Sequence, residues 1–268
     1  MISAPDHLER TINQICDFIR EVTTRAGRKN LVIGLSGGID SSLSAALSVR
    51  ALGSEHIFGI MMPYRSSSEA SLSDAQALAS WLHIETTVES ISPMVDAFFA
   101  NREADELRRG NKMARERMSI LFDYAHDRNA LVVGTGNRTE IALGYTTWYG
   151  DSACSFNPIG ELYKTEVRAM ARHLGMPASI ITKAPSADLW QGQTDESEIG
   201  VTYELIDQIL VALLDDGVRN RRGLEKHFPK ASVARVIELI NRHYYKRQLP
   251  IIASLSKKPI PDRIELSE

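Results

Sequence analysis

The chain has 268 residues, with 31 Lys and Arg against 34 Asp and Glu, so its net charge is −3. Apolar residues make up 43% and charged residues 24%, values typical of globular proteins that exclude a disordered chain. The two cysteines exclude a disulfide scaffold and fit the reducing cytoplasm. No apolar run reaches the ~18 residues of a membrane span, and the first ten residues lack the apolar stretch of a signal peptide. The slightly acidic balance argues against a nucleic-acid partner.

Strands and helices are predicted to alternate through residue 150. An amphipathic helix opens the chain, with apolar side chains at helical spacing between Leu8 and Val22. Short apolar runs then predict strands at 31–35, 56–62, 84–90 and 130–134, separated by helices at 39–49, 69–82 and 105–127. Helices between successive strands imply parallel crossovers. We therefore expect an α/β fold with a three-layer, doubly wound parallel sheet over about residues 29–150.

The pattern changes after Gly150, where helices at 164–174, 202–214 and 231–245 are separated by glycines, prolines and polar loops. We expect a helical extension over about 151–250, packed on the same sheet, within a single domain spanning 1–268. The stretch 185–198 is expected to form a mobile loop, and 251–268 a loosely held tail.

The most informative segment follows the first predicted strand and runs from Gly34 to Ser42, with the sequence GLSGGIDSS. Gly37 and Gly38 allow a tight turn whose N–H groups meet an anion, and the next helix adds its positive N-terminus. Serine hydroxyls are suitable donors to phosphate oxygens. Asp40 would repel bare phosphate, so its presence suggests a bridging Mg²⁺. The alternative is a serine-rich turn in which Asp40 only caps the helix.

This loop does not match the Walker A pattern, because no Gly-Lys-Ser/Thr closes it. It resembles instead the pyrophosphate loop of the ATP pyrophosphatases, a family of adenylating enzymes. That resemblance implies a loop that holds pyrophosphate while ATP is cut between its α- and β-phosphates.

A second cluster, GTGNRTE, covers residues 134–140 directly after the fourth predicted strand. It nearly matches GxGxxG, but Thr139 replaces the third glycine, so it is weak support for a dinucleotide fold. The cluster is predicted at the same sheet edge as the first loop. Thr135 is then placed to contact a nucleotide, and Glu140 to be a second metal carboxylate beside Asp40. The alternative for Glu140 is a first-turn charge favoured by the helix dipole.

A third cluster places Lys164 at a predicted helix start, where the dipole disfavours a cation. A compensating anion is therefore expected, and ATP phosphate is one candidate. The alternative is a solvated lysine. The seven histidines show no metal-ligand spacing, so no zinc site is predicted.

Four segments in order extend the resemblance to the ammonia-dependent NAD synthetases. They are VVGTGNRTEIALGY, NPIGELYKTEV, KAPSADLWQGQTDESEIGVTYELID and YYKRQLP, and the similarity runs from about Lys29 to Pro250. The resemblance implies a ligase that adenylates the nicotinate carboxylate of deamido-NAD with ATP and Mg²⁺. Ammonia then displaces AMP. It also implies a homodimer. No glutaminase domain is seen, so ammonia is expected from solution or from a separate supplier.

The resemblance also implies roles for individual residues. Asp40 and Lys164 would be catalytic, and Asp40 and Glu140 would bind Mg²⁺. ATP would contact Gly34, Leu35, Ser36, Gly37, Gly38, Ile39, Asp40, Ser41, Thr135, Lys164 and Ser186. Deamido-NAD would contact Arg115 and Lys246. Apart from the resemblance, ammonia must attack as the free base, and Asp151 is our candidate for the carboxylate that takes its proton.

The chain departs from the commonest family pattern around the deamido-NAD pocket. Trp148 stands where a lysine is usual, Ser155 replaces an aspartate, and Tyr245 replaces the histidine of a His-Lys pair. We expect an aromatic pocket wall in which Trp148 and Tyr245 meet the substrate, with Trp148 packed on the dinucleotide. Two rival functions remain: a different adenylating pyrophosphatase, and a nucleotide-binding regulator, which would not need both Asp40 and Glu140.

Overall fold

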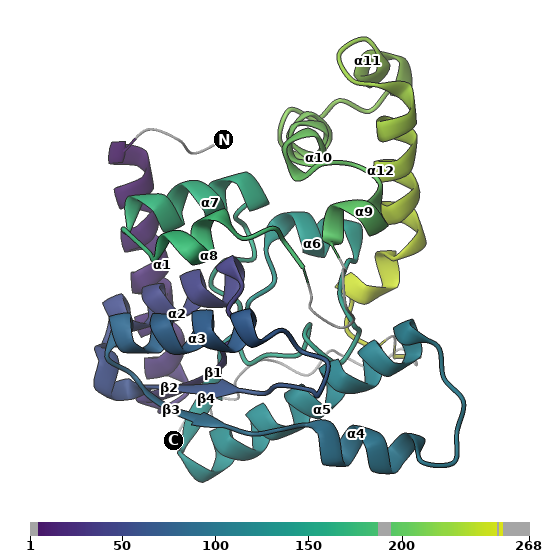
Figure 1. The fold of residues 1–268 in the computed structure, drawn as a ribbon. Coiled ribbons are helices and arrows are strands. Elements are labelled where there is room, and N and C mark those ends of the chain that lie inside the picture. Colours follow the sequence, from purple (N-terminus) through teal and green to yellow (C-terminus); the bar gives the residue numbers. More distant parts are fainter. Residues whose placement is uncertain (1–4, 187–193, 251, 254–268) are drawn as a thin grey trace.

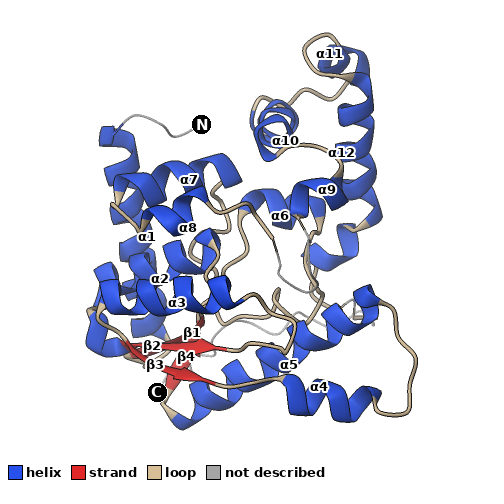
Figure 2. Ribbon diagram, in the orientation of Figure 1, coloured by secondary structure: helices blue, strands red, loops and turns tan. Residues whose placement is uncertain are grey.

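A parallel sheet of four strands forms the centre of the computed structural model, which describes residues 5–186, 194–250 and 252–253 (Figures 1 and 2). The strands run in the order β3-β2-β1-β4, and every pairing is parallel. Their bounds are β1 Asn30–Gly34, β2 Ile57–Met61, β3 Glu85–Val88 and β4 Ala130–Val132. The predicted α/β class is confirmed.

Strand β1 is buried on both faces of the sheet. Leu31 and Ile33 belong to the hydrophobic cluster on one face, and Val32 between them belongs to the cluster on the other. This alternation follows from the two-residue period of a strand, and it explains why the sequence shows a continuous apolar run.

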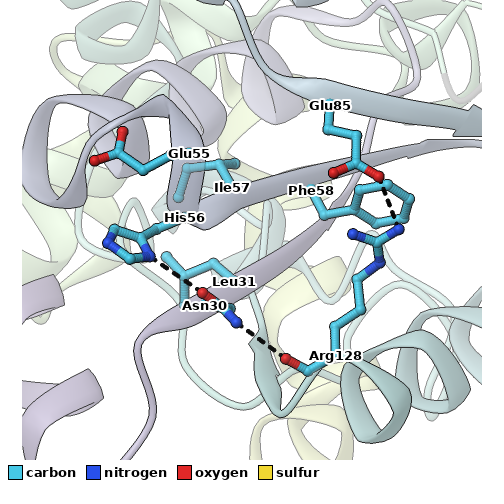
Figure 3. Close-up of a pocket in the computed structure, with 8 residues that line it drawn as sticks. All are labelled: Asn30, Leu31, Glu55, His56, Ile57, Phe58, Glu85 and Arg128. Atoms are coloured by element: carbon cyan, nitrogen blue, oxygen red, sulfur yellow. Dashed lines mark hydrogen bonds and ion pairs between the residues drawn. The ribbon is translucent and has the colours of Figure 1, made fainter.

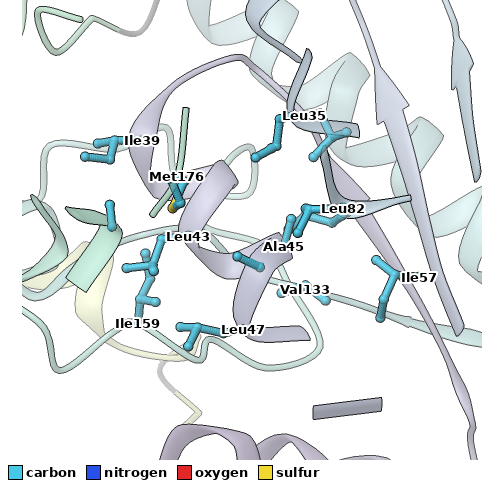
Figure 4. Close-up of a cluster of buried hydrophobic side chains, with 14 of the residues drawn as sticks. Leu35, Ile39, Leu43, Ala45, Leu47, Ile57, Leu82, Val133, Ile159 and Met176 are labelled. Atoms are coloured by element: carbon cyan, nitrogen blue, oxygen red, sulfur yellow. The ribbon is translucent and has the colours of Figure 1, made fainter. Parts of the chain in front are cut away.

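Helices cover the two faces in separate layers. The first layer surrounds the almost entirely buried helix α2, whose packing is drawn in Figure 4. Its members are α1 (Pro5–Arg25), α2 (Ile39–Leu52), α3 (Glu69–Leu82), α7 (Lys164–His173) and α8 (Ala178–Thr182). The opposite layer contains α4 (Ser92–Phe99) and α5 (Glu106–Asp127). The structure is therefore three-layered, as predicted.

The helical extension is only partly packed on the sheet. Helices α7 and α8 join the first layer, but the later helices share a third hydrophobic cluster with α6 that contains Tyr203, Ile206 and Val236. These helices form a lobe beside the sheet (Figure 1): α6 (Arg138–Leu143), α9 (Asp195–Ile199), α10 (Tyr203–Leu210), α11 (Arg221–Glu225) and α12 (Lys230–Arg242). Among the described residues, no helix has the length and apolar character needed to cross a membrane.

The predicted elements before residue 150 are all found, with strands up to three residues shorter than expected. Helices α4, α6, α8, α9 and α11 were not predicted, because five- to eight-residue helices show too little periodicity. The predicted tail lies outside the described residues apart from 252–253.

The chain reverses its winding between β1 and β4. From β1 it proceeds outward through α2, β2, α3 and β3, and then returns through α5 on the opposite face to place β4 on the other side of β1. In open parallel sheets, ligands bind at such a point, outside the carboxyl ends of the strands. The loops that begin at Gly34 and Gly134 meet there.

Candidate active site

The phosphate loop between β1 and α2 is a tight turn held together by its own hydroxyl groups. Ser36 Oγ accepts a hydrogen bond from Gly38 N at 3.2 Å and lies 3.0 Å from Ser41 Oγ. Ser42 Oγ donates to Gly38 O at 2.7 Å. Gly37 has φ +71°, and a Cβ there would lie 2.2 Å from Ser71 O, so only glycine fits.

Three predicted site residues are in direct contact at the end of this loop. Lys164 Nζ donates to Asp40 Oδ2 at 2.6 Å and to Glu140 Oε1 at 3.0 Å. The lysine side chain is 2% exposed, whereas the carboxylates are 18% and 17% exposed. The alternative of a solvated Lys164 is therefore wrong. The expected compensating anion is present within the chain itself, as two carboxylates.

Asn137 completes this centre, and it was missed from sequence. Its Nδ2 donates to Asp40 Oδ1 at 2.8 Å, so both oxygens of Asp40 are bonded. Asn137 also caps α6 in a capping box with Glu140, whose Oε2 accepts from Asn137 N. Glu140 thus lies in the first turn of α6, as its alternative interpretation predicts, and its other carboxylate oxygen accepts from Lys164 of the site. The spacing N-x-x-E is the signal that could have identified Asn137.

Burial dominates the electrostatics of the centre. Desolvation raises the pKa of Glu140 to about 8, with Lys164 opposing the rise and Asp40 adding to it. The pKa of Lys164 is raised because Asp40 and Glu140 outweigh the desolvation of its ammonium. The ammonium also lies 4.9 Å from the centre of the Tyr203 ring. Tyr203 in turn donates to the buried Asp195 at 3.1 Å.

A buried carboxylate from the lobe joins the two helices that carry Glu140 and Lys164. Asp207 Oδ1 accepts from Thr139 Oγ1 at 2.5 Å, and its Oδ2 accepts from Thr165 N at 2.8 Å. Thr139 Oγ1 itself accepts from Lys164 N at 3.0 Å. Asp207, which is 0% exposed, therefore fixes the N-termini of α6 and α7 to each other.

The four predicted substrate residues form a second cluster. Arg115 on α5 donates to the carbonyl oxygen of Trp148, at 3.3 Å from Nε and 3.2 Å from Nη2. The Trp148 ring lies edge-on to Tyr245, with 5.2 Å between ring centres, and stacks on Tyr149 at 4.5 Å. Lys246 Nζ donates to the carbonyl oxygens of Gly144 and Thr146. Desolvation lowers the pKa of Lys246.

A cavity of about 200 Å³ is lined by one residue of each cluster, Glu140 and Lys246, together with Thr135 and Asp151. Asp151 accepts hydrogen bonds from Thr146 Oγ1 and from Thr147 N, so its carboxylate also shapes the turn that precedes it. The cavity therefore extends from Glu140 of the first cluster to Lys246 of the second.

A second cavity, of about 280 Å³, lies at the opposite edge of the sheet (Figure 3). Asn30, Ile57 and Glu85, the first residues of β1, β2 and β3, line it together with Arg128. None of the predicted site residues lies there, and the amino ends of parallel strands are not where such sheets bind ligands.

Ser186, a further predicted ATP contact, lies in the segment that follows α8. It is exposed and directly precedes residues 187–193, the part of the predicted loop that lies outside the described residues. A cation missed from sequence, Lys183, lies three residues earlier. Its Nζ donates to Gly37 O of the phosphate loop at 3.4 Å and to Asp74 Oδ2 at 3.0 Å.

Comparison with known proteins identifies the family. The family model described as NAD synthase matches residues 11–250. An NH(3)-dependent NAD(+) synthetase of Fusobacterium nucleatum is 49% identical over 252 residues, which cover 94% of this chain and 98% of that protein. The NH3-dependent NAD synthetase structure from Campylobacter jejuni is 35% identical, with a TM-score of 0.79, over 92% of this chain and 99% of that one.

A third match has a different name. The structure of NMN synthetase from Francisella tularensis is 34% identical and has a TM-score of 0.83, covering 92% of this chain and 99% of that one. Together with the geometry at the carboxyl edge of the sheet, these matches confirm the resemblance seen in the sequence. The chain belongs to the NAD synthase family.

Proposed function

We propose that the chain is an ammonia-dependent NAD⁺ synthetase, a ligase that converts deamido-NAD to NAD with ATP as co-substrate. The observation that carries this proposal is the contact of Asp40, Glu140 and Lys164 beside the phosphate loop. One cavity extends from Glu140 to Lys246, which belongs to the second cluster, that of the predicted substrate residues. Family membership and the names of the ammonia-dependent relatives support it.

The reaction has two steps. An oxygen of the nicotinate carboxylate attacks the α-phosphorus of ATP, the bond to the β-phosphate oxygen breaks, and pyrophosphate leaves. Ammonia then attacks the carbonyl carbon of the adenylate, AMP leaves with the bridging oxygen, and one proton is lost. The loop around Gly37 and Gly38 would hold the pyrophosphate with backbone N–H groups, and Lys164 would offset its charge.

Holding the two reactants in line is the second contribution of the fold. Arg115 donates to the carbonyl oxygen of Trp148, and Lys246 directly follows Tyr245 in the chain. Together they would bind deamido-NAD so that its carboxylate enters the cavity beside Thr135 and Glu140. Asp151 borders the same cavity and would take the proton released by ammonia.

The residues present fit a magnesium ion. Asp40 and Glu140 offer two partly exposed carboxylates, the hard oxygen ligands that Mg²⁺ prefers, and phosphate oxygens would complete the set. The described residues contain no group of three or more acidic, His or Cys side chains that could hold a metal without such help. When bound, Mg²⁺ would neutralise phosphate charge.

We further propose a cytoplasmic homodimer that takes ammonia from solution or from a separate supplier. Both cysteines, Cys16 and Cys154, are free, which suits a reducing compartment. Phe98, Leu107 and Phe122 are exposed on the α4 and α5 layer, where a second copy would cover them. Light scattering on the purified chain tests the dimer, and a monomeric mass would contradict it.

A second candidate substrate is nicotinic acid mononucleotide, whose amidation gives NMN. It is favoured by the likeness to the Francisella tularensis NMN synthetase. The same residues would perform the same adenylation, and only the pocket that receives the rest of the substrate would differ. The aromatic side chains of Trp148 and Tyr245, where the family pattern has polar ones, would line that pocket.

The purified chain should be incubated with ATP, Mg²⁺, ammonium and deamido-NAD, and the NAD formed should be measured. Glutamine in place of ammonium should give no NAD. Nicotinic acid mononucleotide in place of deamido-NAD should give a much lower kcat/KM. A higher value for the mononucleotide would favour the second candidate, and no amide from either substrate would contradict both.

A further inference from the structure

Lys183 forms a cluster with α3 on the outer side of the phosphate loop. Its Nζ donates to Gly37 O at 3.4 Å, to Ser71 Oγ at 3.1 Å and to Asp74 Oδ2 at 3.0 Å. The Lys183 and Asp74 side chains are 25% and 16% exposed, so the ion pair is largely shielded from water. Lys183 is the residue directly after α8.

The contact of Lys183 with Gly37 O also affects the orientation of the Gly38 N–H. Gly37 C=O and Gly38 N–H belong to the same planar trans peptide, in which the carbonyl and the N–H point in opposite directions. A cation that holds the oxygen therefore also orients the N–H. Gly38 N donates to Ser36 Oγ, which in turn lies 3.0 Å from Ser41 Oγ. The N–H is thus directed to the hydroxyl side of the loop, away from Lys183.

Gly38 is the N-cap of α2, and the first N–H groups of a helix are its natural anion donors. From these positions we infer that Lys183 is a positioning residue for pyrophosphate. It anchors the Gly37 carbonyl so that the Gly38 N–H, which donates to Ser36 Oγ in this structure, faces the side of the loop where the leaving phosphates would lie. Its ammonium also polarises the peptide, which strengthens that N–H as a donor.

Asp74 neutralises the charge of Lys183, so the ion pair adds no net charge to the loop. The pair therefore acts by orienting the peptide between Gly37 and Gly38. Gly37 packs so closely on α3 that a Cβ would lie 2.2 Å from Ser71 O and 3.1 Å from Asp74 Cβ. The phosphate loop therefore packs directly on α3. Lys183, which follows α8, contacts both the loop and α3.

This inference rests on the proposed function of the loop, and pyrophosphate itself is the probe that tests it. Titration calorimetry of the full chain with Mg²⁺ should measure pyrophosphate and AMP separately. Lys183→Met should weaken pyrophosphate binding about tenfold, the loss of one hydrogen bond that involves a charged group, and leave AMP binding unchanged. Lys183→Arg should restore most of the affinity. Asp74→Asn should keep it, because the contact with Gly37 O remains.

Lys226→Met, on the exposed end of α11, is the matched control and should bind both ligands as the wild type does. Wild-type pyrophosphate affinity in Lys183→Met would overturn the inference. So would equal losses for pyrophosphate and AMP that follow a lower melting temperature, since Lys183 would then only tie α8 to α3. If the wild type forms no NAD but pyrophosphate binding still depends on Lys183, the proposed function fails and the inference stands. If the wild type forms NAD but does not bind pyrophosphate, the inference fails and the proposed function stands.

Discussion

Asn137 Nδ2 donates to Asp40 Oδ1 at 2.8 Å, and so links two loops that are 97 residues apart in the chain. One loop leaves β1 and the other leaves β4, the two strands at which the winding of the sheet reverses. Lys164 from α7 binds the other oxygen of Asp40. The position of this one carboxylate is therefore set by three separate parts of the sequence, and its geometry depends on the whole fold.

Removing the charge of Asp40 tests its role in the reaction. We expect Asp40→Asn to lower NAD formation by about 10³-fold or more, because the amide cannot serve as an anionic ligand in a site that depends on charge. The circular dichroism spectrum should be unchanged, since Lys164 keeps its bond to Glu140. Asp127→Asn, at the exposed end of α5, is the control. Near-normal turnover by a well-folded Asp40→Asn protein would rule out the metal assignment.

Lys164 is expected to stabilise the fold as well as the reaction. Lys164→Met leaves Asp40 and Glu140 close together without a cation, and breaking a buried ion pair in this way costs about 3–5 kcal/mol. Urea unfolding at pH 9, above the pKa of about 8 that burial gives Glu140, measures the loss. The double variant Lys164→Met with Glu140→Gln should recover part of it, because one of the two like charges is gone. Equal stability of Lys164→Met and the wild type would contradict the central place given to this contact.

Trp148 is expected to bind deamido-NAD without affecting ATP. Trp148→Ala should raise the KM for deamido-NAD by about tenfold, the value of an aromatic stacking contact. The KM for ATP should stay the same, because the phosphate loop is not touched. Trp148→Phe keeps a ring beside Tyr245 and should retain most of the affinity. An unchanged KM for deamido-NAD in Trp148→Ala would show that the ring does not pack on the substrate.

Asp207 is predicted to stabilise the folded state, since it holds the first turns of α6 and α7 together. Asp207→Ala leaves the Thr165 N–H and the Thr139 hydroxyl without this acceptor. The free energy of unfolding should fall by about 2–4 kcal/mol, the cost of buried donors left without partners. Asp207→Asn should lose less, because its carbonyl oxygen still accepts one hydrogen bond. A change below about 0.5 kcal/mol, the size of an ordinary surface substitution, would contradict this role.

The sequence alone was sufficient to predict the sheet and those site residues that directly follow a strand. Gly37, Gly38 and Asp40 follow a buried strand directly, so their place at the carboxyl edge could be predicted from the strand alone. Lys164 was suspected because a cation at a helix start needs an anion. That the anion consists of Asp40 and Glu140 follows only from tertiary packing.

The long-range contacts of Asn137, Lys183 and Asp207 were missed for the same physical reason. Each acts through a residue distant in sequence: Asn137 on Asp40, Lys183 on Gly37 and Asp207 on Thr139. Periodicity and motif spacing report on neighbours along one element and not on such pairs. The expectation that the whole extension packs on the sheet failed in part for a related reason, because the sequence shows that α10 and α12 are amphipathic but not which partner their apolar faces meet.

The path of one oxygen atom tests the proposed reaction most directly. Deamido-NAD labelled with ¹⁸O in both oxygens of the nicotinate carboxylate should be converted with ATP and ammonium, and AMP and pyrophosphate should be analysed by mass spectrometry. Attack of the carboxylate on the α-phosphorus predicts one ¹⁸O in each AMP and none in pyrophosphate. AMP without label, or label in the pyrophosphate, would contradict adenylation at the α-phosphorus and with it the assigned role of the phosphate loop.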